Sequence, residues 1–297
     1  MFAINQLITS SIESEGVNMT RLGKFEKVVE VVSKELNEQR NVNTAVVGGM
    51  DTGKDFSVII PNILLEEEKN LVVIDPIDQI SNVYTFKEKQ GYHILTYNLE
   101  KEDILQQLNN DLMTKKEEKL LIHVTFPNEF LKKQEMNSQR VMEFLMKIKE
   151  MQDIKWGQEK SLHLFLMEYE EYASPEFHAI FQTWCGYRIS TTLSVQHVLR
   201  LDDVILDNCH YVLYKRILDP QTAEWIAETL KYHHVEFLPK ILGTNLLSLP
   251  LTAGMLMDLP INLGLLQKNY RENPYGNDSW TKFVETYNAE DILGRAL

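Results

Sequence analysis

Apolar and polar positions alternate along most of this chain in a pattern that predicts strands separated by helices. A strand is expected at residues 45–47, followed by a glycine turn, a helix beginning at Lys54 and a second buried strand at 71–74. Helical spacing recurs over residues 141–151 and 222–230. Further apolar runs predict strands at residues 93–97, 120–126, 162–167, 189–195, 211–217 and 261–266. Because several runs are apolar throughout, we expect an α/β fold with a mostly parallel sheet and helices on both faces.

Three regions are expected along the chain. Residues 25–36 carry apolar positions at helical spacing, which predicts a helical N-terminal extension over residues 1–43. The alternating strands and helices then predict one α/β domain over residues 44–270. The Asn, Pro and Gly residues after that domain predict a C-terminal tail over residues 271–297.

Charge and composition exclude several classes of protein. The formal net charge is −13, and non-specific affinity for nucleic acid depends on Lys and Arg side chains, so we expect weak direct nucleic-acid binding at most. The longest apolar neighbourhood, residues 246–266, is broken by proline, glycine and aspartate, so no membrane insertion is expected. The two cysteines and the absence of an export signal indicate a cytoplasmic protein.

One motif carries specific chemistry. Residues 48–55 fit the pattern GxxxxGK, placed after an apolar strand and before a helix, which is the context of a P-loop. The glycines let successive backbone N–H groups surround a phosphate, and the lysine reaches the β and γ oxygens. We therefore expect ATP or ADP to bind this loop. Its residues are Gly48, Gly49, Met50, Asp51, Thr52, Gly53, Lys54 and Asp55.

The last position of the motif is unusual. Asp55 stands where a Ser or Thr hydroxyl normally binds Mg²⁺, and a carboxylate there could bind the ion or repel the phosphate. Two apolar strands could offer the second acid on the metal side, one ending at Asp75 and one at Glu168. The pattern does not choose between them. If Glu168 is the relevant acid, Met167 occupies the position of the usual aspartate.

Histidine and acidic clusters elsewhere predict no further metal site. The eight histidines do not show metal-ligand spacing with Cys185 or Cys209, so we expect ordinary strand and loop histidines. The acid-rich stretch near His178 is more typical of a solvated surface.

From the P-loop onward the sequence resembles one family. Residues 53–64 read GKDFSVIIPNIL and residues 72–76 read VVIDP, which is similar to the first helix and the "DPKGE" strand end of TraG/VirD-type coupling ATPases of type IV secretion. Residues 167–169 match the family's "DEF". The resemblance spans roughly residues 44–266. Its other elements lie at residues 189–196, 207–209, 219–224 and 251–266.

The resemblance implies a P-loop NTPase of the RecA/FtsK-like type, with catalytic roles for two residues. Glu168 would orient the attacking water, and Gln196 would lie near the γ-phosphate. The chain also departs from the family. Met167 replaces the aspartate before Glu168, and Ile77 and Gln79 replace the Lys and Glu of "DPKGE". We expect the chain to lack the family's membrane helices and its sizeable all-α insertion.

Two functional hypotheses follow. In the first, the chain binds ATP with Mg²⁺ held by Asp55 and hydrolyses it weakly or not at all, while it helps couple a substrate to the transfer channel. In the second, it is a pseudo-ATPase adaptor that binds no nucleotide. The resemblance implies conjugation or secretion proteins as partners, relaxosome components among them, and recruitment to the inner face of a bacterial membrane. Because the family forms hexameric motors, the resemblance also allows for a homo-oligomer of this chain.

Overall fold

The described residues form one layered α/β structure. The computed structural model describes residues 43–115, 118–126, 134–153, 161–184, 187–198, 203–230, 235–238, 252–259 and 264–268. The predicted N-terminal extension, apart from Asn43, and the predicted C-terminal tail lie outside these residues. Within the described part of the chain, no helix is long and apolar enough to cross a membrane.

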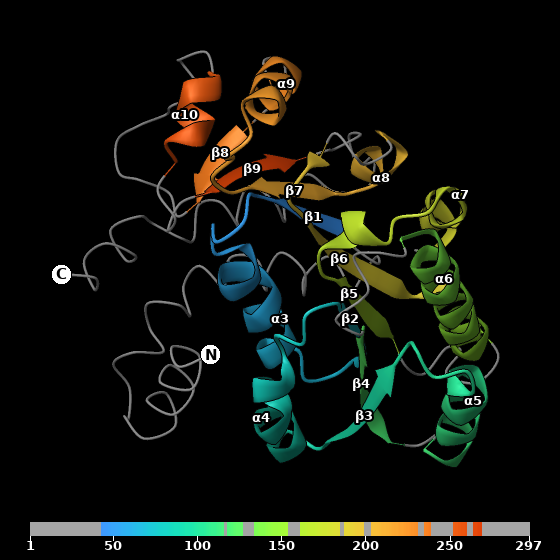
Figure 1. Cartoon of the computed structure of the whole chain (residues 1–297). Coiled ribbons are helices and arrows are strands. Elements are labelled where there is room, and N and C mark those ends of the chain that lie inside the picture. Colours follow the sequence, from blue (N-terminus) through green and yellow to red (C-terminus); the bar gives the residue numbers. More distant parts are fainter. Residues whose placement is uncertain are drawn as a thin grey trace, which may run out of the picture.

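A nine-stranded sheet lies at the centre of these residues (Figure 1). Its order is β3-β4-β2-β5-β6-β1-β7-β9-β8. Strands β1 to β7 pair in parallel, whereas β9 pairs antiparallel with both β7 and β8. The bounds are β1 Asn43–Val47, β2 Asn70–Asp75, β3 Tyr92–Asn98, β4 Lys119–Thr125, β5 Leu162–Leu166, β6 Ile189–Val195, β7 Tyr211–Tyr214, β8 Val235–Leu238 and β9 Gly264–Lys268.

Helices cover both faces of the sheet, as expected. Alternate residues of each strand enter two separate apolar clusters: Val46 and Val73 pack with the first helix, whereas Val47 and Val72 pack with the later helices. The first face carries α3 (Ile60–Leu65) and α4 (Tyr84–Lys89). The other helices are α5 Ile104–Thr114, α6 Gln134–Met151, α7 Pro175–Trp184, α8 Asp203–Asp207, α9 Pro220–Leu230 and α10 Ala253–Met257.

The helix after the P-loop begins where the sequence predicted but has an irregular first turn. Residues Asp55–Ile59 form a π-helical turn, closed by a hydrogen bond from the Ile60 N–H to the Asp55 carbonyl. Pro61 follows at once and has no N–H to donate, and its ring conflicts with regular helical bonding to the preceding turn. The wider π turn accommodates the proline inside a continuous helical segment.

The antiparallel edge differs from the sequence prediction. The strand expected at residues 211–217 ends at Tyr214, and the Ile217 N–H donates to the carbonyl of Leu256 in α10 instead. The final strand is shifted to Gly264–Lys268, and β8 was not predicted at all. With four residues, β8 is too short to show a strand period in the sequence.

Candidate functional site

The P-loop follows β1, the strand that lies between β6 and β7 in the sheet. The Gly48 N–H donates to the Val195 carbonyl of β6, and the Gly49 N–H donates to the Arg216 carbonyl that follows β7, both at 3.0 Å. A Cβ atom on Gly48 would lie 2.7 Å from Thr52 Oγ1, which is closer than real contacts allow. Glycine at this position therefore lets the loop fold back onto the sheet.

The rest of the loop adopts a conformation that suits an anion. Asp51 and Gly53 have left-handed backbones, with φ of 56° and 76°. The Thr52 hydroxyl donates to the Gly49 carbonyl at 2.8 Å and closes the loop. Left-handed residues between right-handed ones turn successive N–H groups toward one point, and the following helix adds its positive end. The N–H groups of Gly48 and Gly49 already donate to backbone carbonyls, so the N–H groups of residues 51–55 are the candidate donors to a phosphate.

Lys54 is buried and points at the end of β5. Its Nζ lies 2.8 Å from Glu168 Oε1 and 3.7 Å from Asp55 Oδ2. Gln196, just after β6, donates from Nε2 to the other oxygen of Glu168 at 2.6 Å. The structure thus brings Lys54, Asp55, Glu168 and Gln196 together, although Lys54 and Glu168 are 114 positions apart in sequence. Met50 and Asp51 lie at the exposed tip of the loop.

Two further residues complete this cluster, and sequence reasoning missed both. Ser194 of β6 accepts from the Glu168 N–H at 3.2 Å and donates to Asp55 Oδ1 at 3.1 Å. Glu170 accepts from the Gln196 N–H at 2.6 Å and is almost fully buried. The signal for Ser194 was its place near the end of β6, two residues before Gln196, because side chains two apart in extended chain share a face.

Burial and mutual repulsion control the charges. Burial lowers the pKa of Lys54, but Asp55, Glu168 and Glu170 more than offset this, so its pKa is raised overall. Burial raises the pKa of Asp55, and the repulsion from Glu168 adds to the effect while Lys54 opposes it. Burial raises the pKa of Glu170 to about 7. Lys54 is therefore a cation, whereas the carboxyl groups of Asp55 and Glu170 lose their protons less readily than usual.

Glu168 has a strained backbone that the surrounding core holds in place. Its φ of 49° is left-handed, which is unfavourable for a residue with a side chain. The preceding Met167 is fully buried in the apolar cluster beneath α3, and its N–H donates to the Ile74 carbonyl at 3.0 Å. The position of the usual aspartate is thus part of the hydrophobic core, and the carboxylate of Glu168 turns toward Lys54 instead.

Asp75, the alternative acid, has different partners. It ends β2, which β5 and β6 separate from β1 in the sheet order. Its carboxylate accepts from the N–H groups of Gln79 at 2.5 Å and Ile80 at 2.9 Å, and it lies beside His123. Of the two acids considered from the sequence, Glu168 is therefore the one that contacts Lys54.

The loop fits a phosphate in geometry, and its oxygen atoms fit Mg²⁺. The left-handed residues Asp51 and Gly53 directly precede the buried Lys54, whose ammonium can hold a phosphate oxygen. The carboxylates of Asp55 and Glu168, which both lie beside the Lys54 ammonium, are the hard oxygen ligands that Mg²⁺ prefers. With three carboxyl groups around one lysine, a bound phosphate requires compensation by a cation or by protons.

Comparison with protein families finds one match within this chain. The family model for type IV secretory system conjugative DNA transfer matches residues 4–110, which include the P-loop and β2. The chain resembles the conjugative DNA-transfer family. The resemblance seen in the sequence is thereby confirmed. No curated protein matches the chain.

Two solved structures are similar to this chain. VirB4 of Thermoanaerobacter pseudethanolicus is similar with a TM-score of 0.50 and 11% identity, covering 78% of this chain and 90% of VirB4. The DNA-packaging ATPase B204 from Sulfolobus Turreted Icosahedral Virus has a TM-score of 0.42 and 15% identity, covering 63% of this chain and 81% of that protein. The likeness to VirB4 and the mostly parallel sheet confirm the predicted P-loop NTPase-like fold class.

Proposed function

We propose that this chain is a P-loop ATPase-type component of a conjugation or type IV secretion system. In this proposal it binds ATP or ADP at residues 48–55, hydrolyses ATP slowly or not at all, and helps couple a substrate to the transfer channel. The observation that carries the proposal is the contact of Lys54 with Glu168, and of Glu168 with Gln196, at the base of an anion-binding loop.

Each residue has a role that follows from its place. The backbone of residues 51–55 and the Lys54 ammonium hold the phosphates. Asp55 supplies the oxygen ligand for Mg²⁺ that Met167 cannot supply. Glu168 orients the attacking water, and Gln196 links that carboxylate to the end of β6. The Lys54 ammonium has three N–H donors, so it can bind a phosphate oxygen while one N–H still donates to Glu168.

Weak hydrolysis follows from the same contacts. Both oxygens of Glu168 accept hydrogen bonds, one from Lys54 and one from Gln196, which lowers its capacity to accept from a water. The apolar packing of Met167 removes the usual metal carboxylate. Phosphoryl transfer depends on Mg²⁺ to neutralise charge and on a positioned water, so loss of either slows turnover more than it weakens binding.

Calorimetry and thermal unfolding with nucleotide test the proposal. At a nucleotide concentration of 100 times Kd, linkage stabilises the fold by about 2.7 kcal/mol, which corresponds to a rise in Tm of roughly 5–10 °C for a domain of this size. We expect Lys54→Ala to abolish the rise and the exposed control Lys89→Ala to preserve it. The absence of a Tm shift at any ATP or ADP concentration, with or without Mg²⁺, would contradict the proposal. A phosphate-release assay on the same samples measures turnover.

A second candidate function is favoured by the charge of the site. Three carboxyl groups surround Lys54, and this excess of acid opposes a phosphate. The chain would then be an adaptor of such a machine that binds no nucleotide. Calorimetry separates the two candidates, because the adaptor gives no heat of binding with ATP and Mg²⁺ even after Glu168→Gln removes one charge.

The proposed partners are proteins of the conjugation or secretion machinery, including relaxosome components, at the cytoplasmic face of the membrane. The formal charge of −13 supports protein partners over direct DNA contact. We expect no submicromolar DNA complex at physiological salt in fluorescence anisotropy. Light scattering with and without ATP tests whether the chain also forms a homo-oligomer.

A further inference from the structure

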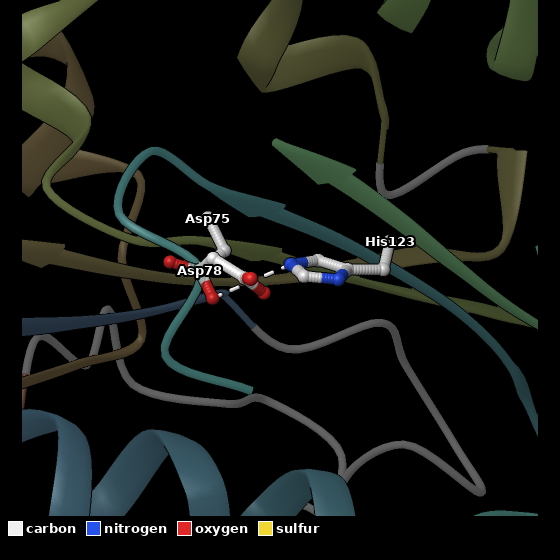
Figure 2. A group of neighbouring side chains, drawn as sticks. All are labelled: Asp75, Asp78 and His123. Carbon is white, nitrogen blue, oxygen red and sulfur yellow. Dashed lines mark ion pairs between the residues drawn. The ribbon is translucent and has the colours of Figure 1, made fainter. Parts of the chain in front are cut away.

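A second polar cluster lies away from Lys54, where β2 and β4 end (Figure 2). Asp75 is the last residue of β2, and Asp78 lies in the turn that follows. His123 belongs to β4, where it pairs in register with Val73 of β2. One ligand atom from each of the three side chains lies within 4.8 Å of the others. Figure 2 shows the imidazole pointing toward the two carboxylates.

The imidazole of His123 is fully buried, and one of its nitrogens makes no hydrogen bond. Its Nδ1 contacts the Tyr84 hydroxyl. Its Nε2 lies 3.3 Å from Asp75 Oδ2, but the geometry does not make a hydrogen bond. If Nδ1 carries the proton, the lone pair of Nε2 faces carboxylate oxygens, which repel it. If Nε2 carries the proton, it faces Asp75 Oδ2 at 3.3 Å without hydrogen-bond geometry, which leaves a buried donor poorly satisfied.

Among the described residues, no lysine or arginine balances the two carboxylates. Asp75 is fully buried, and the described residues place no lysine or arginine within ion-pair distance of it or of Asp78. Backbone N–H groups of Ile77, Gln79 and Ile80 hold the Asp75 carboxylate in one orientation. A buried carboxylate is normally paired with a cation or coordinates a metal.

Asp78 also occupies a costly backbone position. Its φ of 55° is left-handed, a conformation that glycine adopts without strain. An aspartate at this point brings an acidic side chain to within reach of the other two ligands. Strain of this kind persists where the side chain has a use.

We propose that Asp75, Asp78 and His123 bind a divalent transition-metal ion of the zinc or manganese class. An ion bound to Nε2 removes the conflict at that nitrogen and balances the two carboxylates. The mixed set of one imidazole and two carboxylates suits Zn²⁺ or Mn²⁺, whereas Mg²⁺ prefers oxygen ligands alone. Three protein ligands leave further positions for water or for a ligand from outside.

Tyr84 is a positioning residue for this site. A metal-bound histidine usually donates its other ring N–H to an acceptor, which fixes the tautomer and the ring orientation. The Tyr84 oxygen takes that role at Nδ1. Its ring also packs edge-on against the imidazole, with centroids 5.6 Å apart. Loss of such a partner typically weakens metal binding by about 10–100-fold.

Calorimetric titration of the nucleotide-free chain with ZnCl₂, MnCl₂ and MgCl₂ tests the proposal. We expect one Zn²⁺ or Mn²⁺ per chain, bound more tightly than Mg²⁺. Asp78→Asn should weaken the transition-metal affinity at least about tenfold, and Tyr84→Phe by about 10–100-fold. Asp78 is exposed and asparagine tolerates a left-handed backbone, so this variant keeps the fold even if His123→Gln does not. The exposed control Asp258→Asn should bind as the original chain does.

The site is separable from the P-loop. Lys54→Ala should leave Zn²⁺ or Mn²⁺ binding unchanged, so failure of nucleotide binding does not affect this test. Co²⁺ bound in place of the native ion should give a visible d–d spectrum that Asp78→Asn alters. The proposal is overturned if neither Zn²⁺ nor Mn²⁺ binds saturably, or if Asp78→Asn and Asp258→Asn bind them as well as each other.

Discussion

Glu170 gives the protein a stability that depends on pH. The residue is only 2% exposed to solvent, and its Oε1 accepts a hydrogen bond from the backbone N–H of Gln196. Burial, more than the neighbouring Glu168, raises its pKa from 4.5 to about 7. The folded state therefore holds this proton more tightly than the unfolded state. The protonated Glu170 therefore contributes its full stabilisation of the folded state below about pH 4.5, and this contribution is lost as the pH rises through about 7.

The size of the effect follows from linkage. A pKa of about 7 against 4.5 corresponds to about 3 kcal/mol once Glu170 is ionised in both states. At about pH 5 the cost is only about 1 kcal/mol, because the folded state keeps its proton there. Glu170→Gln removes the charge and keeps an oxygen that can accept from the Gln196 N–H. We therefore expect the variant's advantage in free energy of unfolding to grow by about 2 kcal/mol between about pH 5 and pH 8.5.

Urea unfolding at the two pH values measures this difference. Any change in packing caused by Gln is independent of pH and cancels in the comparison. Glu176→Gln, an exposed substitution of the same chemistry, serves as the control and should show no growth with pH. If the Glu170→Gln advantage is the same at both pH values, the reasoning from burial is refuted.

Three further predictions concern the P-loop and its support. Asp55→Asn should tighten the binding of Mg²⁺-free ATP, because a like charge about 5 Å from a phosphate costs about 1–3 kcal/mol. Weaker binding of ATP by this variant, measured by calorimetry in EDTA, would count against phosphate repulsion by Asp55. With Mg²⁺ present the same variant should weaken binding, since Asp55 is the proposed metal ligand. Gly53→Ala should lower the free energy of unfolding by about 1–2 kcal/mol in urea titration, because φ is 76°. Met167→Asp should destabilise by about 3–5 kcal/mol in the same assay, since it places a charge in the apolar cluster beneath α3, and an unchanged midpoint would contradict that placement.

The sequence by itself determined the fold class and the loop. Central strands of the parallel sheet are covered on both faces, so β2, β4 and β5 were visible as mostly apolar runs. The P-loop was visible because glycine spacing and a following lysine are local features. Residues 235–238 were missed because four residues carry too little pattern, and their strand exists only through pairing with β9.

Only the tertiary structure decided which side chains meet. Asp75 and Glu168 both follow apolar strands and look alike in sequence, but the order β2-β5-β6-β1 places Glu168 against Lys54 and Asp75 against His123. His123 likewise read as an ordinary strand histidine, because its ligand-like neighbours come from a different strand and a turn. The order of the strands depends on how the helices pack over the whole sheet. Hydrophobic periodicity reports only local structure, so the sequence pattern does not reveal that order.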